Sequence, residues 1–440
     1  MQRDAIKNLI LWKDSFSRKP LVVYGMRQVG KTWLIKEFGS RQYKNTAYVS
    51  FDNNQTAKNI FSKDFDIARI IQELEILTNM KILPQETLII FDEVQECPLA
   101  LTSLKYFYEN APQYHIISAG SLLGVMSFEG TGFPVGKVDI MTLYPMTFLE
   151  FLTALGKEKL ADIVKDNHFS AINTFGPELT QLLKQYFFVG GMPSAVKTYA
   201  ANNNFSDVRH EQEIILNGYY ADFAKHIPSK EIAKVKLIWD SAPVQLGKEN
   251  KRFLYSDMKE GSRGREYETA LKWLEDAGLL HKINRVSLPN IPLVSYKEQN
   301  IFKLYLADIG LLSARTNMSA KTYLESDSQF FTHYKGILAE QFVLQELRAA
   351  NRSLPIYYWA TDKNIAEVEF VIQYENKIIP IEVKSGKNIK SESLKHYIEK
   401  FNPDIAVRTS LSQYQKNKTI SDIPLYLIGN VANIVGKPQI

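Results

Sequence analysis

Eight residues near the start of the chain have the types and the spacing of a phosphate-binding loop. They follow the pattern G-x-x-x-x-G-K-T, and the apolar run Leu21–Tyr24 comes directly before them. Glycines let the backbone turn tightly enough for its N–H groups to point at one phosphate chain, while the lysine reaches the β- and γ-phosphates and the threonine hydroxyl binds Mg²⁺. The pattern predicts binding of ATP or GTP, without deciding between them. Its residues are Gly25, Met26, Arg27, Gln28, Val29, Gly30, Lys31 and Thr32.

A second segment supplies the acids that nucleotide hydrolysis needs. The short apolar run Thr87–Phe91 is followed directly by Asp92 and Glu93. Such a run suits a strand buried on both faces of a parallel sheet, and ligands bind at the carboxyl ends of such strands. We expect Asp92 to support Mg²⁺ and Glu93 to polarise the attacking water. The alternative is that both acids merely end the strand and face solvent, which the upstream phosphate loop disfavours.

A third segment, Tyr114–Ser121, reads as another strand that ends in small polar residues. Some nucleotide hydrolases have an added strand between the phosphate loop and the acid-bearing strand, and a polar side chain on it contacts the γ-phosphate or the water. Ser121 has the place of such a sensor. The alternative is ordinary turn chemistry, since Gly-Ser commonly follows a strand. An earlier strand is expected over Ala47–Asp52, where β-branched and aromatic residues alternate with small or polar ones.

Five motifs together point to one family: Gly25–Thr32, Phe91–Gln95, Ser118–Ser121, Leu143–Phe151 and Gly190–Pro193. They resemble those of prokaryotic AAA+-superfamily ATPases that carry a C-terminal domain similar to PD-(D/E)XK nucleases, and the resemblance covers nearly the whole chain. It implies an α/β fold class: a P-loop NTPase (AAA+-like) parallel sheet with a helical lid, a winged helix and a C-terminal α/β nuclease-like domain.

The resemblance also implies a further contact to the γ-phosphate. In that family a Gly-Arg pair usually precedes the Leu-Tyr-Pro segment, and the arginine is a plausible partner of the γ-phosphate. Here the pair is Gly136-Lys137. Lysine keeps the positive charge but lacks the planar fork that stabilises a spread phosphoryl charge, so we expect slow or partner-dependent hydrolysis. AAA+ enzymes often work as rings in which one subunit supplies a residue to its neighbour. The sequence therefore leaves two alternatives open: Lys137 acts in its own subunit, or it acts in a neighbouring subunit of an oligomer.

The chain divides into four predicted parts. Residues 1–150 form the ATPase core, and 151–230 show the helix-like spacing of a lid that Gly190–Pro193 interrupts. This bend suits close helix packing; the alternative is a nucleotide contact. Residues 231–318 alternate helices with a β-hairpin, in an order that resembles a winged helix, and 319–440 form the nuclease-like domain.

The winged-helix region contains a basic, glycine-containing stretch that could neutralise the phosphates of double-stranded DNA. The alternative, held as about equal, is that the region only packs the outer domains together. The basic residues are Lys248, Lys251, Arg252, Lys259, Arg263 and Arg265.

The last part carries a second candidate chemistry. Glu369, Glu382 and Lys384 have the order of a metal nuclease, and Glu340 would close the site from a helix. Glu382 and Lys384 share one face of a strand, which places a carboxylate for Mg²⁺ beside an ammonium group. The family's first strand ligand is normally Asp, and the longer Glu369 puts cleavage in doubt because Mg²⁺ geometry is strict. A fold kept for binding or assembly is the favoured alternative.

Composition limits the kinds of protein that this chain can be. With 440 residues, of which 45% are apolar, the chain is expected to form two to four domains. Its one cysteine, Cys97, excludes an internal disulfide. No apolar run approaches about 18 residues, so we expect a cytoplasmic protein that does not enter a membrane. A net charge of +5 permits DNA binding without establishing it.

Three functions therefore compete. We favour an ATPase that couples hydrolysis to DNA binding or processing. The second is a regulatory NTP switch that hydrolyses slowly and binds a protein partner, and the third is an ATP-gated, metal-dependent nuclease.

Overall fold

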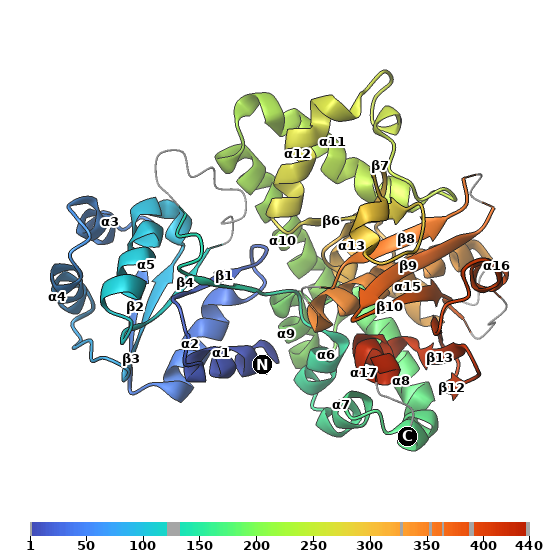
Figure 1. Cartoon of the computed structure of the whole chain (residues 1–440), viewed down its shortest axis with the longest axis horizontal. Helices are drawn as coiled ribbons and strands as arrows, with labels where there is room; N and C mark the ends of the chain where they lie inside the picture. Colours follow the sequence, from blue (N-terminus) through green and yellow to red (C-terminus); the bar gives the residue numbers. More distant parts are fainter. Residues whose placement is uncertain are drawn as a thin grey trace. The chain divides into compact units, whose positions relative to one another are not determined.

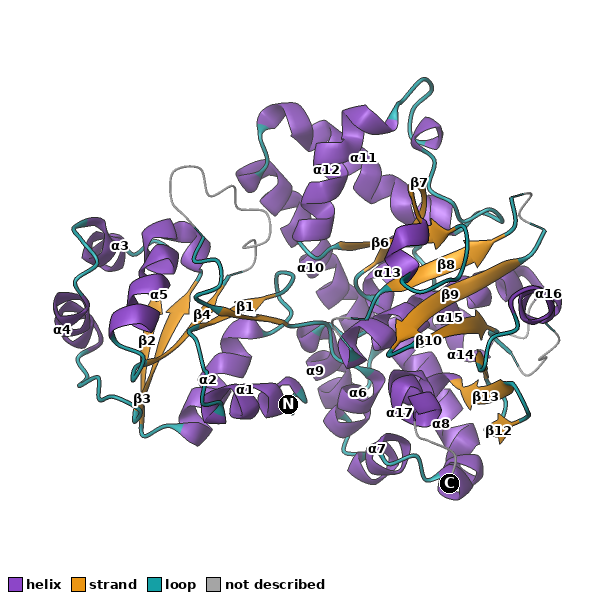
Figure 2. Ribbon diagram, viewed as in Figure 1, coloured by secondary structure: helices purple, strands orange, loops and turns teal. Residues whose placement is uncertain are grey.

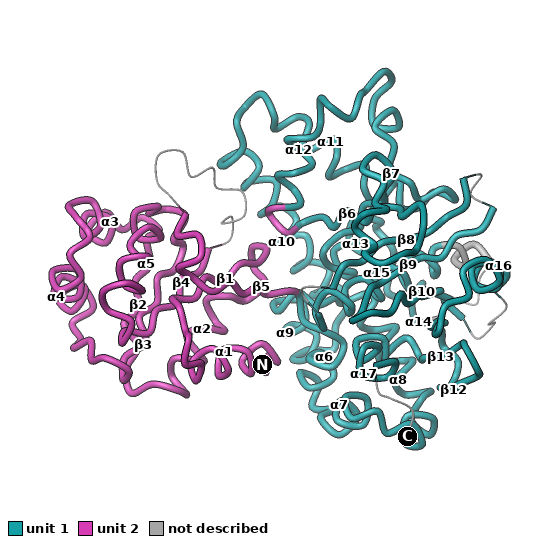
Figure 3. The backbone as a smooth tube through the Cα atoms, viewed as in Figure 1, with its two compact units in different colours: residues 1, 145–275, 279–440 teal, residues 2–144, 276–278 magenta. Residues whose placement is uncertain are grey.

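The computed structural model describes residues 2–120, 133–325, 329–351, 354–362, 365–386 and 391–436. They form two compact units, drawn in different colours in Figure 3. One unit holds residues 2–144 with 276–278, and the other holds 145–275 and 279–440. We call them the N-terminal unit and the C-terminal unit. The four-part division made from the sequence remains a prediction.

The N-terminal unit is built on a five-stranded sheet in which every neighbouring pair is parallel (Figure 2). The strand order is β2-β3-β4-β1-β5, so β4 lies between β1 and β3. Strand β3 is buried at every position, as its apolar run predicts. The strands are β1 Leu21–Tyr24, β2 Asn45–Ser50, β3 Thr87–Asp92, β4 His115–Ala119 and β5 Asp139–Thr142.

Helices cover this sheet and bury an apolar core against it. Phe51, Phe61 and Phe91 meet edge to face, with ring centroids 5.3 to 5.7 Å apart. Such contacts add to the free energy gained from apolar burial. These rings therefore pack together at the ends of β2 and β3. The helices are α1 Ala5–Asp14, α2 Lys31–Gln42, α3 Gln55–Ser62, α4 Ile67–Thr78, the 3₁₀ turn η1 Val94–Glu96 and α5 Pro98–Asn110.

The first part of the C-terminal unit is helical (Figure 1). The bend at Gly190 and Gly191 packs closely against other parts of the chain: a Cβ on Gly190 would lie 2.4 Å from Asp308 Oδ1 and 2.6 Å from the Gly310 backbone nitrogen, and one on Gly191 would lie 2.2 Å from the Met146 carbonyl oxygen. The two glycines are thus explained by close packing. The helices are α6 Phe148–Ala154, α7 Glu158–Lys165, α8 Phe169–Val189, α9 Pro193–Asn202, α10 Phe205–His226, α11 Ser229–Leu246, α12 Gly264–Asp276 and α13 Ile309–Arg315.

A mixed eight-stranded sheet completes this unit, in the order β12-β13-β11-β10-β9-β8-β6-β7. The β6–β7 hairpin, which belongs to the predicted winged helix, joins the C-terminal strands through a short parallel pairing of β6 with β8. The strands are β6 Leu280–Val286, β7 Lys297–Leu306, β8 Ile356–Ala360, β9 Glu367–Tyr374, β10 Lys377–Val383, β11 Ala406–Ser410, β12 Gln415–Lys416 and β13 Ile420–Pro424. The accompanying helices are α14 Ala320–Glu325, α15 Gln329–Ala350, α16 Glu392–Phe401 and α17 Val431–Gly436.

The predicted fold class is confirmed as an α/β protein with a P-loop-type parallel sheet and a C-terminal domain on a mixed sheet. Among the helices that the structure describes, none is long and apolar enough to span a membrane.

Candidate nucleotide-binding site

The predicted phosphate loop connects the end of β1 to the start of α2. Gly25, Gln28 and Gly30 all have positive φ angles, of 149°, 65° and 93°. Gly25 also passes so close to the chain after β5 that a Cβ would lie 2.5 Å from the Leu143 carbonyl oxygen. Only glycine adopts these conformations without cost, so the two glycines of the motif fix the path of the loop. Helix α2 then begins at Lys31 with its free N–H groups facing the loop.

The ammonium group of Lys31 lies inside this loop. Its Nζ donates to the carbonyl oxygens of Gly25 at 2.8 Å and Met26 at 2.9 Å, and the side chain is 8% exposed. Burial lowers the pKa of Lys31 to about 8, against the opposing charges of Glu93 and Asp92. Its hydrogen bonds to neutral carbonyls could be exchanged for bonds to phosphate oxygens.

Arg3 supports the same loop and was missed by the sequence analysis. The side chain is 5% exposed, and its guanidinium donates to the Val29 carbonyl at 3.0 Å and to the Tyr144 carbonyl at 2.6 Å. It therefore ties the loop to the segment after β5. No local pattern could reveal this contact, because the three residues are far apart in the sequence.

The two predicted acids lie at the carboxyl end of β3. Asp92 is 3% exposed, and its carboxylate accepts hydrogen bonds from the Tyr48 hydroxyl at 2.9 Å and from the Glu93 N–H at 3.0 Å. Burial and the bond to Asp92 raise the pKa of Tyr48 to about 12. Glu93 has a positive φ of 51°, and its carboxylate accepts a hydrogen bond from Gln95. Tyr48 is a second residue that the sequence analysis missed.

Strand β4 brings a serine between the loop and these acids. Ser118 is paired in register with Val22 of β1, two residues before that strand ends at Tyr24, and with Phe91 of β3, the residue before Asp92. It is fully buried, and its hydroxyl makes no hydrogen bond within the described part of the chain. The predicted sensor, Ser121, lies outside the described residues. Ser118 thus offers a polar group at the expected place.

The residues present fit a magnesium ion. Thr32 is half-buried in the first turn of α2, and Asp92 lies at the same carboxyl edge of the sheet. Mg²⁺ is usually bound by one or two protein oxygens together with phosphates and waters, so a hydroxyl and a carboxylate suffice.

Comparison with known families supports the assignment of a nucleotide-binding domain. Residues 17–152 match a family model described as an AAA domain. The chain carries an AAA-type P-loop ATPase domain. Two further models, each described as a domain of unknown function, match residues 180–322 (DUF8612) and 335–428 (DUF4143). No curated protein matches the chain.

Several solved structures are similar to parts of the chain. A Walker-type ATPase of Pyrococcus abyssi has 14% identity and a TM-score of 0.47, over 72% of this chain and 95% of its own. The Orc1 protein of Aeropyrum pernix, solved in complex with DNA, has 12% identity and a TM-score of 0.30, over 72% and 93%. The RuvB Holliday junction branch migration motor of Thermotoga maritima has 12% identity and a TM-score of 0.31, over 67% and 91%.

Lys137 lies near the amino-terminal ends of the strands in the AAA domain's sheet, whereas the phosphate loop follows the carboxyl end of β1. It comes just before β5, whose first residue, Asp139, pairs with the first residue of β1, Leu21. A four-residue strand spans roughly 13 Å, so β1 separates this edge from the loop. Lys137 forms an ion pair with Glu109 at 2.9 Å. Within its own chain, Lys137 therefore lies away from the phosphate loop.

The nuclease-like residues do come together in the C-terminal unit. Glu340 on α15 and Glu382 on β10 are buried, Glu369 on β9 is partly exposed, and the three carboxyl groups lie close enough to influence one another's charge. Burial, with the neighbouring charges of Glu382 and Glu340, holds the pKa of Glu369 well above its usual range. Lys384 pairs with Glu382 at 2.6 Å. We call these four residues, together with Lys251, Lys303 and Glu367, the buried charge cluster.

Lysines that the sequence analysis did not place here pair with acids in the buried charge cluster. Lys251, from the basic stretch, pairs with Glu340, which also accepts a hydrogen bond from the Tyr305 hydroxyl at 3.2 Å. Lys303, only 1% exposed, pairs with Glu367. Among the described residues, no three His, Cys, Asp or Glu side chains are arranged to hold a metal ion. The one sequence signal for these lysine pairs was Lys303, which stands inside the apolar run of β7.

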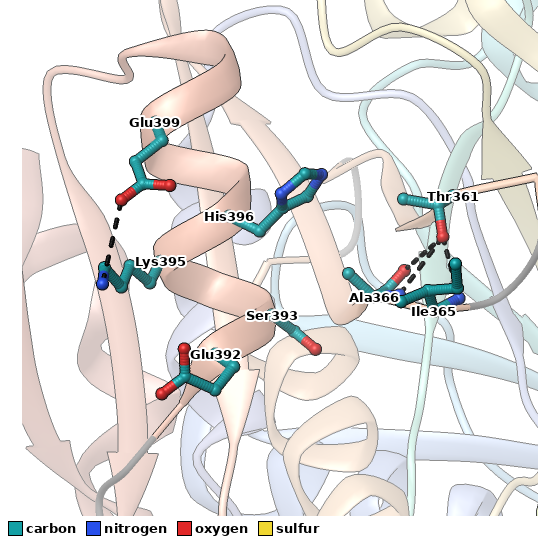
Figure 4. A pocket seen from close by; sticks show the side chains of 8 residues that line it. All are labelled: Thr361, Ile365, Ala366, Glu392, Ser393, Lys395, His396 and Glu399. Carbon is teal, nitrogen blue, oxygen red and sulfur yellow. Dashed lines mark hydrogen bonds and ion pairs between the residues drawn. The ribbon is translucent and has the colours of Figure 1, made fainter.

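A surface hollow of about 380 Å³ lies beside α16 (Figure 4). Its polar groups serve the local fold: the Thr361 hydroxyl accepts from the N–H groups of Ile365 at 2.9 Å and Ala366 at 3.2 Å, and Lys395 lies 3.9 Å from Glu399. His396 stacks on Trp359. Among the described residues that line it, these groups show no arrangement suited to catalysis.

Proposed function

We propose that the chain binds ATP with Mg²⁺ through Gly25–Thr32 and couples its hydrolysis to the binding or processing of double-stranded DNA. One observation carries the ATPase part: strand β4 lies between β1 and β3, so that the loop, Ser118 and the Asp92–Glu93 pair end at one edge of a parallel sheet. This is the edge where open α/β sheets bind ligands.

The proposed roles follow from the positions of the side chains. The backbone N–H groups of the loop and of the start of α2 bind the phosphates, and Lys31 exchanges two carbonyl partners for phosphate oxygens. Thr32 and Asp92 would hold Mg²⁺, which neutralises the phosphate charge. Glu93 orients the attacking water after it releases Gln95.

The basic stretch supports the DNA part of the proposal. Lys248 pairs with Asp257 and Lys251 pairs with Glu340, so both are engaged within the protein. Lys259, Arg263 and Arg265 are exposed, and each could neutralise a backbone phosphate.

A test of the DNA part compares the triple variant Lys259→Ala, Arg263→Ala and Arg265→Ala with a control that replaces the exposed Lys395, Lys400 and Lys416. We expect double-stranded DNA to bind and to raise ATP turnover in the wild type and the control. In the triple variant, the slope of the logarithm of the binding constant against the logarithm of salt concentration should become shallower by roughly one for each lost phosphate contact. Equal binding by both triple variants, or no stimulation by DNA in the wild type, would contradict the proposal.

The second candidate is a regulatory switch that hydrolyses slowly and responds to a protein partner. The ion pair of Lys137 with Glu109, away from the loop, favours it, because the chain then lacks this cation at its own phosphates. If Lys137 acts on a neighbouring subunit, turnover per chain should rise with protein concentration and Lys137→Ala should remove the rise. A turnover rate independent of concentration would leave only the slow switch.

The third candidate, an ATP-gated nuclease, is disfavoured by the buried charge cluster. Lys251 and Lys384 pair with Glu340 and Glu382, the carboxylates that would bind a metal. Metal-dependent DNA cleavage that is abolished by Lys384→Ala would establish this candidate.

A further inference from the structure

The buried charge cluster lies where the resemblance to metal nucleases implies a divalent cation. Glu340, Glu369 and Glu382 would be the ligands of that ion, and their carboxyl groups lie close together. Within the part of the chain that the structure describes, however, no group of three His, Cys, Asp or Glu side chains is placed to hold a metal ion. The cluster therefore does not fit the implied ion, and its lysines show why.

Each lysine of the cluster pairs with a different carboxylate. A divalent cation would draw several carboxylates to one point, whereas these ammonium groups neutralise three carboxylates separately. The remaining acid, Glu369, has an oxygen that accepts a hydrogen bond from the Val383 N–H at 3.0 Å. The pairs are Lys251 with Glu340, Lys303 with Glu367, and Lys384 with Glu382.

Lys251 is the member of the cluster that the nuclease-like motif does not explain. It stands 89 positions before its partner, Glu340, and its charge also acts on Glu369. Its ammonium group is thus near two of the three expected metal ligands. Lys251 bonds to one oxygen of Glu340, and the other oxygen accepts the Tyr305 hydroxyl at 3.2 Å. Both oxygens of this expected ligand are already occupied.

The backbone next to Lys251 is anchored, so the pairing does not depend on a loose surface segment. The Phe253 N–H donates to the Phe302 carbonyl of β7 at 2.8 Å, and the two rings stack with their centroids 5.8 Å apart. Gln245 bonds to both the N–H and the carbonyl of Leu254, at 2.7 and 3.0 Å. The Lys251 side chain is 15% exposed. These contacts hold its ammonium group at the cluster.

One carboxylate oxygen of the cluster is still available to a cation. Glu382 is buried, and its Oε2 makes no hydrogen bond within the described part of the chain. A buried acceptor without a partner costs free energy, so this oxygen would gain from a nearby positive charge. The orphaned oxygen indicates that the acids suit a cation of higher charge than the ammonium group beside them.

We propose that the ammonium group of Lys251 stands in place of a divalent cation in the buried charge cluster. The intact chain then binds no metal ion there, and Lys251 fastens the segment that follows α11 to helix α15. Removing the ammonium group frees an oxygen of Glu340 beside Glu369 and Glu382, and an oxygen-seeking ion such as Mn²⁺ binds in its place. This inference uses no residue of the AAA domain.

The test titrates Mn²⁺ into the nucleotide-free full chain by calorimetry and measures urea unfolding with and without Mn²⁺. Lys251→Met should bind one Mn²⁺ at least tenfold more tightly than the wild type does. Mn²⁺ should also raise the unfolding midpoint of this variant but not of the wild type, because a ligand that binds only the folded state stabilises it. Lys251→Gln, which keeps one donor for Glu340, provides a second variant if Lys251→Met does not fold.

Three further changes locate the gained site. Adding Glu369→Gln to Lys251→Met should remove the gained binding, whereas adding Asp92→Asn, in the AAA domain, should retain it. Lys248→Met should gain nothing, because Lys248 lies in the same basic stretch but pairs with Asp257. Three results would overturn the proposal: wild-type Mn²⁺ binding that Glu369→Gln abolishes, no gain in either Lys251 variant, or a gain that survives Glu369→Gln.

Discussion

The phosphate loop and the buried charge cluster both place lysines near acids, but they differ in what those lysines contact. Lys31 donates to two neutral carbonyls of its own loop. Lys251 and Lys384 pair directly with the carboxylates Glu340 and Glu382. A bond to a carbonyl can be exchanged for one to a phosphate, whereas breaking a buried ion pair exposes an uncompensated charge. A buried lysine therefore indicates a ligand site only where its protein partners are neutral.

The largest expected effect is on stability, in Lys251→Met. Removing Lys251 leaves the buried Glu340 without its ion-pair partner, so we expect the free energy of unfolding of the C-terminal unit to fall by about 3 kcal/mol. Lys248→Met is the matched control, because its pair with Asp257 is half exposed and should contribute less than about 1 kcal/mol. Denaturant unfolding measures both, and equal effects would remove the distinction between the two regions.

The next prediction concerns Glu369 and pH. A raised pKa means that the folded chain keeps this carboxyl protonated, so its stabilising contribution is full below the ordinary pKa of about 4.3 and is lost as pH rises toward the folded value. Glu369→Gln mimics the protonated form and should stabilise the protein at pH 8, with little effect near pH 4.

The control for this pH dependence is Glu375→Gln, at an exposed turn. Unfolding curves at the two pH values should coincide with wild type for the control. Destabilisation of Glu369→Gln at pH 8 would show that the carboxylate is needed in its charged form, as a metal site would require.

Arg3→Ala should weaken ATP binding about tenfold. A charge-assisted hydrogen bond contributes about 1.5–3 kcal/mol, and without it the Val29 carbonyl and the loop are held less firmly. The exposed Arg41, replaced by Ala, is the control. Fluorescent-nucleotide titration measures both affinities, and an unchanged affinity in Arg3→Ala would exclude a role in positioning the loop.

Tyr48→Phe should have the smallest effect. It removes one neutral donor to Asp92, so the Mg²⁺ concentration for half-maximal nucleotide binding should rise about threefold. An unchanged magnesium dependence would show that the hydroxyl does not position this carboxylate.

The sequence located the phosphate loop and the strands of the AAA domain well, because these depend on local patterns. The strand predicted at 47–52 is observed at Asn45–Ser50, and β3 ends at Asp92 as expected. Arg3 and Tyr48 were missed because their partners lie far away in the chain. The position of Lys137 could not be predicted, since it depends on the direction of β5 relative to β1.

Contacts between distant parts of the chain also limited what could be predicted for the C-terminal unit. Glu340, Glu369, Glu382 and Lys384 were identified as a group, and the structure does bring them together. The ammonium group of Lys251 comes from the basic stretch, whose sequence indicated DNA contacts. Only the three-dimensional arrangement shows that one of its lysines faces inward.

The central claim is that the carboxyl edge of the AAA domain's sheet binds and hydrolyses ATP. The most direct test is to measure ATP affinity and steady-state turnover for wild type, Lys31→Met and Glu93→Gln in the presence of Mg²⁺. We predict that Lys31→Met loses both, with turnover reduced at least a hundredfold, and that Glu93→Gln binds ATP but does not hydrolyse it. Unchanged ATP affinity in Lys31→Met would contradict the account.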